Sequence, residues 1–368
     1  MKLSIPAETL AGEHRVAATP DTIKKYLGFG HSVVVQRGAG IAAGIPDAAY
    51  REAGATIVSG AAEAFAGEVV LKVRAPSEAE LPQLKAGSHV LALYNPYRNV
   101  LLAQYAQAGI SAFAMELLPR ISRAQSMDVL SSQANIAGYK AVLVAAHHYP
   151  RYFPMLMTAA GTVKAARVLI LGAGVAGLQA IATAKRMGAI VEAFDVRTAA
   201  KEQVESLGAK FVEVAGEAGE AAGGYAKEMS EDYQRKQAEL VHDRAQLADI
   251  VISTALIPGR PAPRLVHART VQAMKPGSVI VDLATEAGGN VEGSVADQVV
   301  SINGVTVIGY TNLAAQVAAD ASALYARNLL NFLTPMFGKD GSFTVNTEDE
   351  IIKASQIVRN GQVLFGAK

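Results

Sequence analysis

The chain has 368 residues, too many for a single hydrophobic core, so we expect two domains. With 51% hydrophobic and 18% charged residues, and many alanines and glycines, its composition is typical of an α/β enzyme. A formal net charge of +1 gives no electrostatic sign of nucleic-acid binding, and the lack of cysteine excludes disulfides, thiolate metal sites and cysteine nucleophiles.

The first part of the chain alternates short β-branched runs with helical runs, such as residues 20–30 and 99–109. This alternation indicates a mostly parallel sheet with crossover helices. The predicted strands are KLSI (2–5), SVVVQ (32–36), EVVLKV (68–73), HVLALY (89–94) and ISAFAM (110–115).

Residues 120–133, RISRAQSMDVLSSQ, form a polar segment after the last of these strands. The segment holds two arginines, two glutamines, an aspartate and four serines in a chain otherwise rich in small apolar residues. Such segments are usually solvated connections, but open α/β sheets bind ligands beyond the carboxyl ends of their strands. Both interpretations stay open at this point.

A long helix predicted for residues 135–148 leads out of the first domain, and residues 312–333 read as a second long helix that returns to it. The NG step at Asn360 predicts a hairpin in the tail.

From the alternating strands and the two long helices, we expect an α/β fold of two Rossmann-like domains with mostly parallel sheets, joined by those helices. The first domain is discontinuous, residues 1–131 plus 312–368, and the second covers residues 132–311. The second series of strands is RVLILG (167–172), AIVEAF (189–194), KFVEV (210–214), DIVIST (249–254), SVIVDL (278–283) and VTVIGY (305–310).

The strongest motif is GAGVAG, residues 172–177, between a buried strand and an amphipathic helix. In a dinucleotide-binding turn, the first glycine permits the tight bend, the second lets the pyrophosphate approach the backbone, and the third lets helix and strand pack closely. The free N–H groups and positive dipole end of the helix favour the pyrophosphate. The context of strand, helix and second strand predicts dinucleotide binding. The similar GAGIAAG at residues 38–44 precedes Ile-Pro and no apolar helix, and we interpret it as a loop.

Asp195 ends the strand that follows this helix, about 20 residues beyond the motif, where an acid accepts hydrogen bonds from the ribose hydroxyls. Arg197 could instead meet the 2′-phosphate of NADP. Because Asp195 would repel that phosphate, we expect NAD.

Three further loops are candidates for the site. Residues 255–265 and 284–290 each follow a predicted strand, so we expect them to line the cofactor site. Glu286 and Asn290 lie in the second loop, where a functional and a solvated position are equally consistent with the sequence. Residues 214–230 form a Gly-, Ala- and Glu-rich stretch around Tyr225, and a loop of that length inside a domain is usually functional or disordered.

Other chemistries have little support in the sequence. The seven histidines are scattered, His147 and His148 have no carboxylate at metal-ligand spacing, and there is no GxSxG nucleophile motif. We expect no metal site. No run approaches the ~20 uninterrupted apolar residues of a membrane span, so we expect no direct insertion into a membrane.

Taken together, RISRAQSMD, GAGVAGLQAIATAKRMGA, VRTAAKEQVESLGAKF, GGYAKEM, TALIPGRPAP and MKPGSVIVDLATEAGGN resemble the NAD(H)-binding subunit (domain I) of proton-translocating nicotinamide nucleotide transhydrogenase. The resemblance covers nearly the whole chain. RISRAQSMD is its most specific element, because the related alanine dehydrogenases share the dinucleotide and MKPGSVIVD stretches but not that segment.

The resemblance implies a homodimer that binds NAD(H) and exchanges hydride with NADP(H) held by a separate domain III, while a membrane-spanning domain II couples the reaction to proton movement. It also implies a cytoplasmic subunit, attached peripherally to the inner membrane through these partners. The matching positions place Arg120, Gln125, Asp128 and Ser131 around the nicotinamide end, with Gln125 also near the second cofactor, and Tyr225 on a loop that closes over the nucleotide. The other implied cofactor-binding residues are Gly172, Ala173, Gly174, Val175, Gly177, Asp195, Val196, Arg197, Ala255, Leu256 and Glu286.

The alternative is an alanine dehydrogenase, which must move protons as well as hydride and needs a general base. That family uses a lysine in a KVK stretch and a histidine soon after it, whereas this chain has Arg74 in LKVRAP and no histidine in LALYNPY (91–97). Arg15 resembles the arginine that binds the substrate carboxylate in that family, and we interpret it as inherited architecture. A non-catalytic NAD-binding protein is the third hypothesis.

Overall fold

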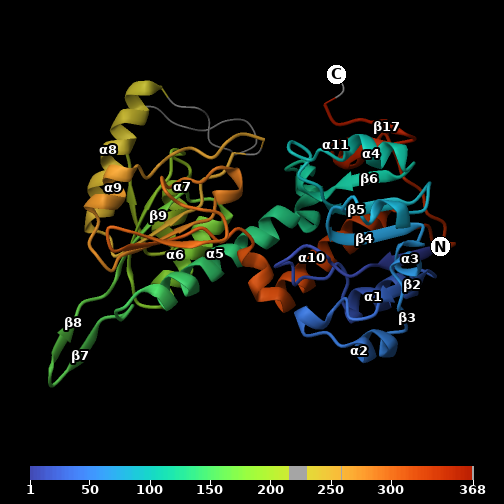
Figure 1. The fold of residues 1–368 in the computed structure, drawn as a ribbon, viewed down its shortest axis with the longest axis horizontal. Helices are drawn as coiled ribbons and strands as arrows, with labels where there is room; N and C mark the ends of the chain where they lie inside the picture. The colour runs from blue at the N-terminus through green and yellow to red at the C-terminus, as the bar shows by residue number, and fades with distance from the viewer. Residues whose placement is uncertain (215–229, 258, 367–368) are drawn as a thin grey trace. The chain divides into compact units, whose positions relative to one another are not determined.

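The computed structural model describes residues 1–366 apart from 215–229 and 258. The chain divides into two compact units, Met1–Gln133 with Ala314–Lys368, and Ala134–Leu313. Each unit contains one large sheet with helices on both faces (Figure 1). The α/β fold with two mostly parallel sheets is therefore confirmed.

The first unit contains an eight-stranded sheet in the order β17-β16-β6-β5-β4-β1-β2-β3. It is parallel except where β16 pairs antiparallel with β6 and β17. Side chains alternate between the faces, so that Leu71 and Leu91 lie in one apolar core and Val70 and Val90 in the other. Its strands are β1 Lys2–Ile5, β2 Ser32–Gln36, β3 Thr56–Val58, β4 Val69–Arg74, β5 His89–Leu93, β6 Ser111–Ala114, β16 Gln356–Arg359 and β17 Gln362–Val363. Its α-helices are α1 Pro20–Gly28, α2 Asp47–Glu52, α3 Ala61–Phe65, α4 Leu102–Gln107, α10 Ala318–Leu333 and α11 Glu350–Ser355, with 3-10 turns η1 Ile41–Ala43, η2 Leu81–Gln83, η3 Met115–Leu117, η4 Ser122–Met127 and η8 Thr334–Met336.

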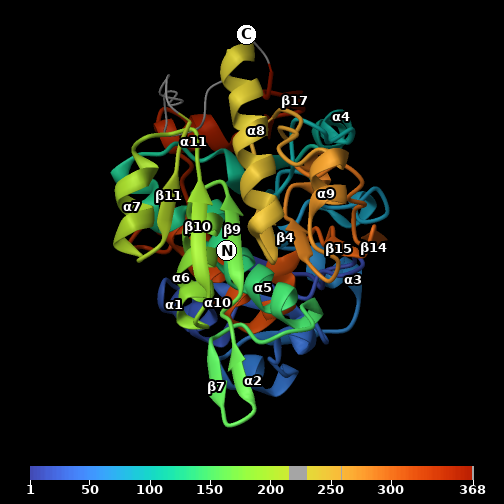
Figure 2. The same ribbon diagram turned by 90° about the vertical axis from the view of Figure 1, so that its left-hand side faces the viewer.

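The second unit contains a seven-stranded sheet in the order β11-β10-β9-β12-β13-β15-β14, parallel except for β14. Val168 and Ile170 pack on the face covered by α6, whereas Leu169 and Leu171 pack on the face covered by α8 (Figure 2). The strand order reverses between β9 and β12. This switch point is where open α/β sheets bind ligands. The elements are β7 Leu156–Thr158, β8 Gly161–Val163, β9 Arg167–Leu171, α6 Val175–Arg186, β10 Ile190–Phe194, α7 Ala200–Ser206, β11 Lys210–Val212, α8 Glu231–Leu247, β12 Ile250–Ser253, α9 Ala268–Ala273, β13 Val279–Asp282, η6 Thr285–Ala287, β14 Val299–Ile302 and β15 Val305–Ile308.

The helix predicted for residues 135–148 begins earlier, because α5 spans Val129–His148 and crosses the division between the units. The Asp128 carboxylate accepts a hydrogen bond from the backbone N–H of Ser131 at 2.9 Å, as a helix N-cap does. The end of the polar segment is thus helix, and η4 occupies most of the rest. The helix predicted for residues 312–333 is divided into η7 Leu313–Val317 and α10.

The hairpin in the tail is present, with Asn360 and Gly361 both at positive φ between β16 and β17. Three other strands or hairpins have no counterpart in the sequence prediction: β3, β14 and the β7–β8 hairpin. The β7–β8 hairpin is a separate two-stranded sheet that projects from the second unit (Figure 1). Met155, directly before β7, and Met157, within β7, are 60% and 71% exposed.

Candidate dinucleotide-binding site

The GAGVAG turn joins the carboxyl end of β9 to the start of α6. Gly172 has φ +94°, a left-handed conformation that a residue with a Cβ adopts only under strain. A Cβ on Gly177 would lie 1.8 Å from the carbonyl oxygen of Gly172, so only glycine allows helix and strand this close. A Cβ on Gly174 would meet no atom within 4 Å, which leaves the backbone open to a ligand. The three glycines thus have the three geometries that a dinucleotide turn requires.

Asp195 follows β10 directly and is 8% exposed. Its Oδ2 accepts a hydrogen bond from the backbone N–H of Ala173 at 2.7 Å, which ties the acid to the GAGVAG turn. The Arg197 guanidinium binds both carboxylate oxygens, from Nε to Oδ1 and from Nη2 to Oδ2, each at 2.8 Å. The structure therefore brings together Ala173, Asp195 and Arg197 of the predicted site, with the half-buried Val196 between the last two.

The ends of β12 and β13 are joined by two fully buried polar residues, Asn290 and Asp282. The Asn290 carboxamide accepts from the N–H of Ala255 at 3.1 Å and donates to the carbonyl of the same residue at 2.9 Å. Of the two interpretations of Asn290, the solvated one is wrong. Glu286 is exposed on η6, and Leu256, after Ala255, is 50% exposed.

In the first unit, the segment 120–133 is held by α10. Asn328 and Asn331 each donate from Nδ2 to the Ser126 carbonyl at 2.9 Å. Arg120 and Gln125 are exposed, and the Ser131 hydroxyl donates to Asp128. The segment thus presents an arginine and an amide on a fixed backbone. Arg123, whose side chain is 51% exposed, pairs with Asp349 at 2.6 Å.

A buried charge cluster lies at the carboxyl ends of β1 and β4 in the same unit. The Arg15 guanidinium donates to both oxygens of Glu13, at 2.7 and 2.6 Å, and to Gln133 Oε1 at 2.8 Å. Arg74 also donates to Glu13, at 2.9 Å. Burial opposes ionisation of Glu13, but the two guanidinium groups outweigh it and lower the pKa to about 2. Arg15 is therefore bound to an internal carboxylate.

Two further buried carboxyl groups flank this cluster. Lys72 forms ion pairs with Glu8 at 3.3 Å and Glu80 at 3.1 Å, and burial still raises the pKa of Glu8. Burial also raises the pKa of Glu116, after β6, to about 7, although it accepts a hydrogen bond from the Asn95 N–H. Asn95, in the LALYNPY stretch that contains no histidine, has φ +48°, a left-handed conformation.

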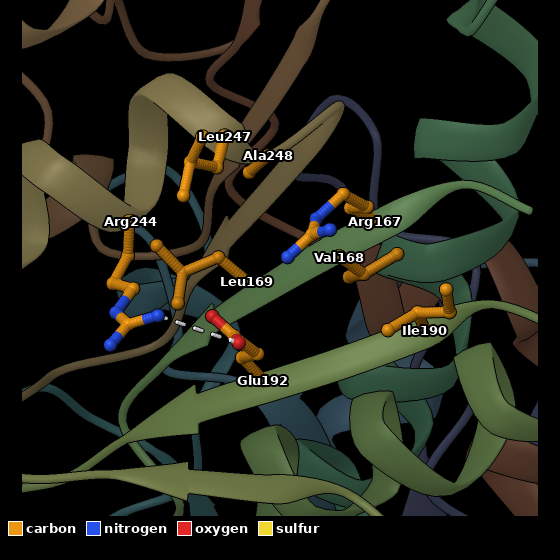
Figure 3. Close-up of a pocket in the computed structure, with 8 residues that line it drawn as sticks. All are labelled: Arg167, Val168, Leu169, Ile190, Glu192, Arg244, Leu247 and Ala248. Carbon is orange, nitrogen blue, oxygen red and sulfur yellow. Dashed lines mark ion pairs between the residues drawn. The ribbon is translucent and has the colours of Figure 1, made fainter.

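Two hollows among the described residues lie away from these groups. One, at the amino ends of β9 and β10, is lined by residues including Arg167, Ile190 and Glu192, with an Arg244–Glu192 ion pair at 3.7 Å (Figure 3). The other lies beside Phe29 and residues 338–341, before β2 begins. Within the described part of the chain, no three His, Asp or Glu side chains are grouped as a metal ion would need, and no helix could cross a membrane. Tyr225 lies outside the described residues.

Sequence reasoning missed two residues that shape the GAGVAG turn. The Thr254 hydroxyl donates to the Gly172 carbonyl at 3.0 Å. Gly138 lies inside α5, where a Cβ would be 2.0 Å from the Ala176 carbonyl oxygen, so α5 and the start of α6 touch backbone to backbone. A glycine inside an otherwise regular helix is a readable sign of such close packing.

Comparisons with known proteins agree with this arrangement. Residues 4–137 match the alanine dehydrogenase/PNT N-terminal domain, and residues 141–366 match the alanine dehydrogenase/PNT C-terminal domain. The chain is 53% identical to an NAD(P) transhydrogenase subunit alpha chain of Rhodospirillum rubrum, over 100% of this chain and 98% of that protein.

A solved structure of a transhydrogenase from Sinorhizobium meliloti has a TM-score of 0.91 at 50% identity, covering 99% of this chain and 100% of that one. The alanine dehydrogenase of Mycolicibacterium smegmatis is 33% identical over 80% of this chain and 75% of that protein. The chain therefore belongs to the alanine dehydrogenase/PNT family, and within it is more similar to these transhydrogenase proteins than to this alanine dehydrogenase.

Proposed function

We propose that the chain is the NAD(H)-binding subunit of a proton-translocating NAD(P)+ transhydrogenase, an oxidoreductase active only with partner subunits. The observation that carries the proposal is the similarity to a transhydrogenase alpha subunit chain, at 53% identity over both sequences. The GAGVAG turn supports the cofactor, because its open Gly174 and its crowded Gly177 have the geometry that a dinucleotide requires.

The residues present fit an NAD(H) molecule in two places. The turn and the first N–H groups of α6 would hold the pyrophosphate, and Asp195 and Val196 the adenosine ribose, whose hydroxyls would displace the Arg197 guanidinium from the Asp195 carboxylate. Arg120, Gln125, Asp128 and Ser131 would hold the nicotinamide end, an assignment that rests on the family resemblance. Ala255, Leu256 and Glu286 follow the strands beyond the switch point, and Tyr225 would act as a lid.

The nicotinamide supplies a hydride that passes from C4 of one ring to C4 of the other, with no proton exchanged at the reacting carbons. The protein's task is then to bind and orient, because no acid, base or metal is needed for that step. The exposed Gln125 and Arg120, on a segment pinned by two asparagines of α10, suit an orienting role.

The proposal includes three partners. NADP(H) would be bound by a separate domain III, and a membrane-spanning domain II chain would couple hydride transfer to proton movement, attaching this subunit peripherally to the cytoplasmic side of the inner membrane. A second copy of the chain would complete a homodimer. Tyr152, Met155 and Met157 near the β7–β8 hairpin are all more than half exposed and suit burial in a dimer.

The second candidate, an alanine dehydrogenase-like activity, is favoured only by Arg15 and the relationship to that family. Arg74 stands where that family has its second lysine, and here it binds Glu13. A mixture of NADH, pyruvate and ammonia separates the two functions. We expect no steady NADH oxidation by the purified chain, although NADH binds. Sustained oxidation with alanine formed would establish the dehydrogenase instead.

A further inference from the structure

Asn290 lies eight residues beyond Asp282, the last residue of β13, and is completely buried. A buried carboxamide is costly unless its donors and acceptor are satisfied. Asn290 Oδ1 accepts from the Ser253 hydroxyl at 2.8 Å and from the Ala255 N–H at 3.1 Å. Its Nδ2 donates to the carbonyls of Ala255 at 2.9 Å and Pro263 at 2.8 Å. All four hydrogen-bonding positions of the side chain are thus used.

The backbone of Asn290 extends the same network. Its N–H donates to Asp282 Oδ1 at 3.2 Å, and its carbonyl accepts from the N–H groups of Leu265 and Val266. Asp282, also fully buried, accepts from Ala284, Val291 and Ser294. The ends of β12 and β13 are therefore linked to each other through one residue.

A single residue, Thr254, connects this network to the GAGVAG turn. Thr254, between Ser253 and Ala255, donates to the carbonyl of Gly172. A Cβ on Gly172 would be 2.8 Å from Thr254 Oγ1, so this side of the turn is tightly packed. Any change in the position of Ala255 would be transmitted to the turn on one side and to Leu256 on the other.

We propose that Asn290 is a positioning residue for the half of the dinucleotide site beyond the switch point, which it sets by fixing both backbone groups of Ala255. The inference rests on the proposed NAD(H) binding and deepens it. Asp195, at the end of β10, serves the adenosine half, and β12 and β13 lie on the other side of β9. A Rossmann sheet binds one nucleotide on each side of the switch point. Loss of Asn290 should therefore weaken binding of the nucleotide on the β12–β13 side and leave binding of the adenosine nucleotide unchanged.

The substitution Asn290→Asp tests the donor groups with almost no change in shape. An ionised carboxylate would direct lone pairs at the carbonyls of Ala255 and Pro263, next to the buried Asp282 carboxylate. Arg264 is the nearby cation, but its guanidinium donates to the carbonyls of Val291 and Gly288. Protonation of the introduced carboxyl would restore one donor, so the defect should diminish as the pH falls.

The experiment compares the dissociation constants of NADH and AMP for the full chain at pH 6 and pH 8. For Asn290→Asp at pH 8 we expect NADH to bind about tenfold more weakly or worse, while the affinity for AMP changes by less than about threefold. The NADH defect should shrink at pH 6. Asn303→Asp is the matched control, because Asn303 also donates to a carbonyl, that of Gln272, but lies between β14 and β15 at the edge of the sheet.

Ser253→Ala is the second variant, because it removes one donor to Asn290 and keeps the carboxamide. It should weaken NADH binding about two- to fivefold and leave AMP binding unchanged. Equal losses for NADH and AMP, or wild-type affinity for both ligands in the folded variants, would overturn the positioning role. If Asn290→Asp does not fold, the NADH and AMP affinities of Ser253→Ala test the positioning role by the same criteria. Failure of the unaltered chain to bind NADH would instead refute the proposed function.

Discussion

The Arg197 guanidinium lies against the carboxylate of Asp195, two residues before it, with both N–O distances at 2.8 Å. The backbone N–H groups of Ala173 and Arg197 donate to the same two oxygens. Each oxygen of Asp195 thus has two donors already, and a ribose that binds this acid must displace one of them. The guanidinium, on a side chain 20% exposed, is the donor that can leave.

Replacing Arg197 with alanine should therefore strengthen NADH binding, because the ribose hydroxyls would no longer compete with an internal cation. We expect the dissociation constant of NADH to fall about two- to tenfold, and that of NADPH to rise or stay unchanged, since Asp195 still repels a 2′-phosphate. Asp195→Asn is the companion variant and should weaken NADH binding. Fluorescence titration measures both. Weaker NADH binding by Arg197→Ala would show that the guanidinium itself contacts the nucleotide.

Gly174 and Gly177 offer a matched pair of alanine substitutions three residues apart. Gly177→Ala places a Cβ 1.8 Å from the Gly172 carbonyl oxygen and should lower the free energy of unfolding by about 2 kcal/mol or more. Gly174→Ala meets no protein atom within 4 Å and should leave stability unchanged, while it weakens NADH binding at least about tenfold. Urea unfolding and NADH titration separate the two effects. Normal NADH binding by folded Gly174→Ala would contradict the pyrophosphate site.

Because of Glu116, the free energy of unfolding of the protein should depend on pH. Burial raises its pKa to about 7 from an ordinary value of 4.5, so between these values the folded state binds more protons than the unfolded chain. The contribution of Glu116 to stability is full below pH 4.5 and is lost as the pH rises through 7. Glu116→Gln should remove this loss, and its free energy of unfolding at pH 8 should exceed that of the unaltered chain by on the order of 2 kcal/mol.

Urea unfolding between pH 5 and pH 8 measures the effect of Glu116, with the exposed Glu52→Gln as the control. Glu13 does not interfere, because its lowered pKa has the opposite sign: its contribution is present above pH 4.5 and is lost as the pH falls towards 2. A parallel pH dependence for Glu116→Gln and the unaltered chain would show that Glu116 is ionised as readily as an exposed carboxyl.

Gln125 is predicted to position the two nicotinamides. Gln125→Asn shortens an exposed side chain on η4 by one methylene and keeps its amide. We expect NADH affinity to change little and hydride transfer to slow by about 10- to 100-fold, because a displacement of about 1 Å at the reacting atoms is enough for that loss. Gln107→Asn, exposed on α4, is the control. Unchanged turnover by Gln125→Asn in a rapid-mixing assay would remove Gln125 from the reacting centre.

Much of the fold could be predicted because its signals are local. The strands β2, β4, β9 and β12 are runs of β-branched residues long enough to show burial on both faces, and the Asn360-Gly361 step marks the tail hairpin. The three-residue strands β3, β7 and β8 are too short to show any period. The early start of α5 was readable in principle, since an aspartate such as Asp128 directly before an apolar run is a preferred helix N-cap residue.

The candidate site was predictable for the same reason where it is contiguous. One βαβ unit contains Gly172, Gly174, Gly177 and Asp195, and their spacing alone predicts a dinucleotide-binding turn. Asn290 acts through residues 27 to 37 positions away, and Arg15 binds Gln133 over 118 positions. No short-range pattern reports such contacts, because they depend on which strands become neighbours.

If this chain presents NAD(H) to an NADP(H)-binding partner, hydride should pass directly between the two nucleotides when the two proteins are mixed. The most direct test mixes the chain with the NADP(H)-binding transhydrogenase subunit (domain III) loaded with NADPH, and adds an NAD analogue whose reduced form absorbs at a separate wavelength. We predict reduction of the analogue that requires both proteins and is strongly diminished by Gly174→Ala. If both proteins have bound their nucleotides and no hydride is transferred, this chain does not present NAD(H) to such a partner.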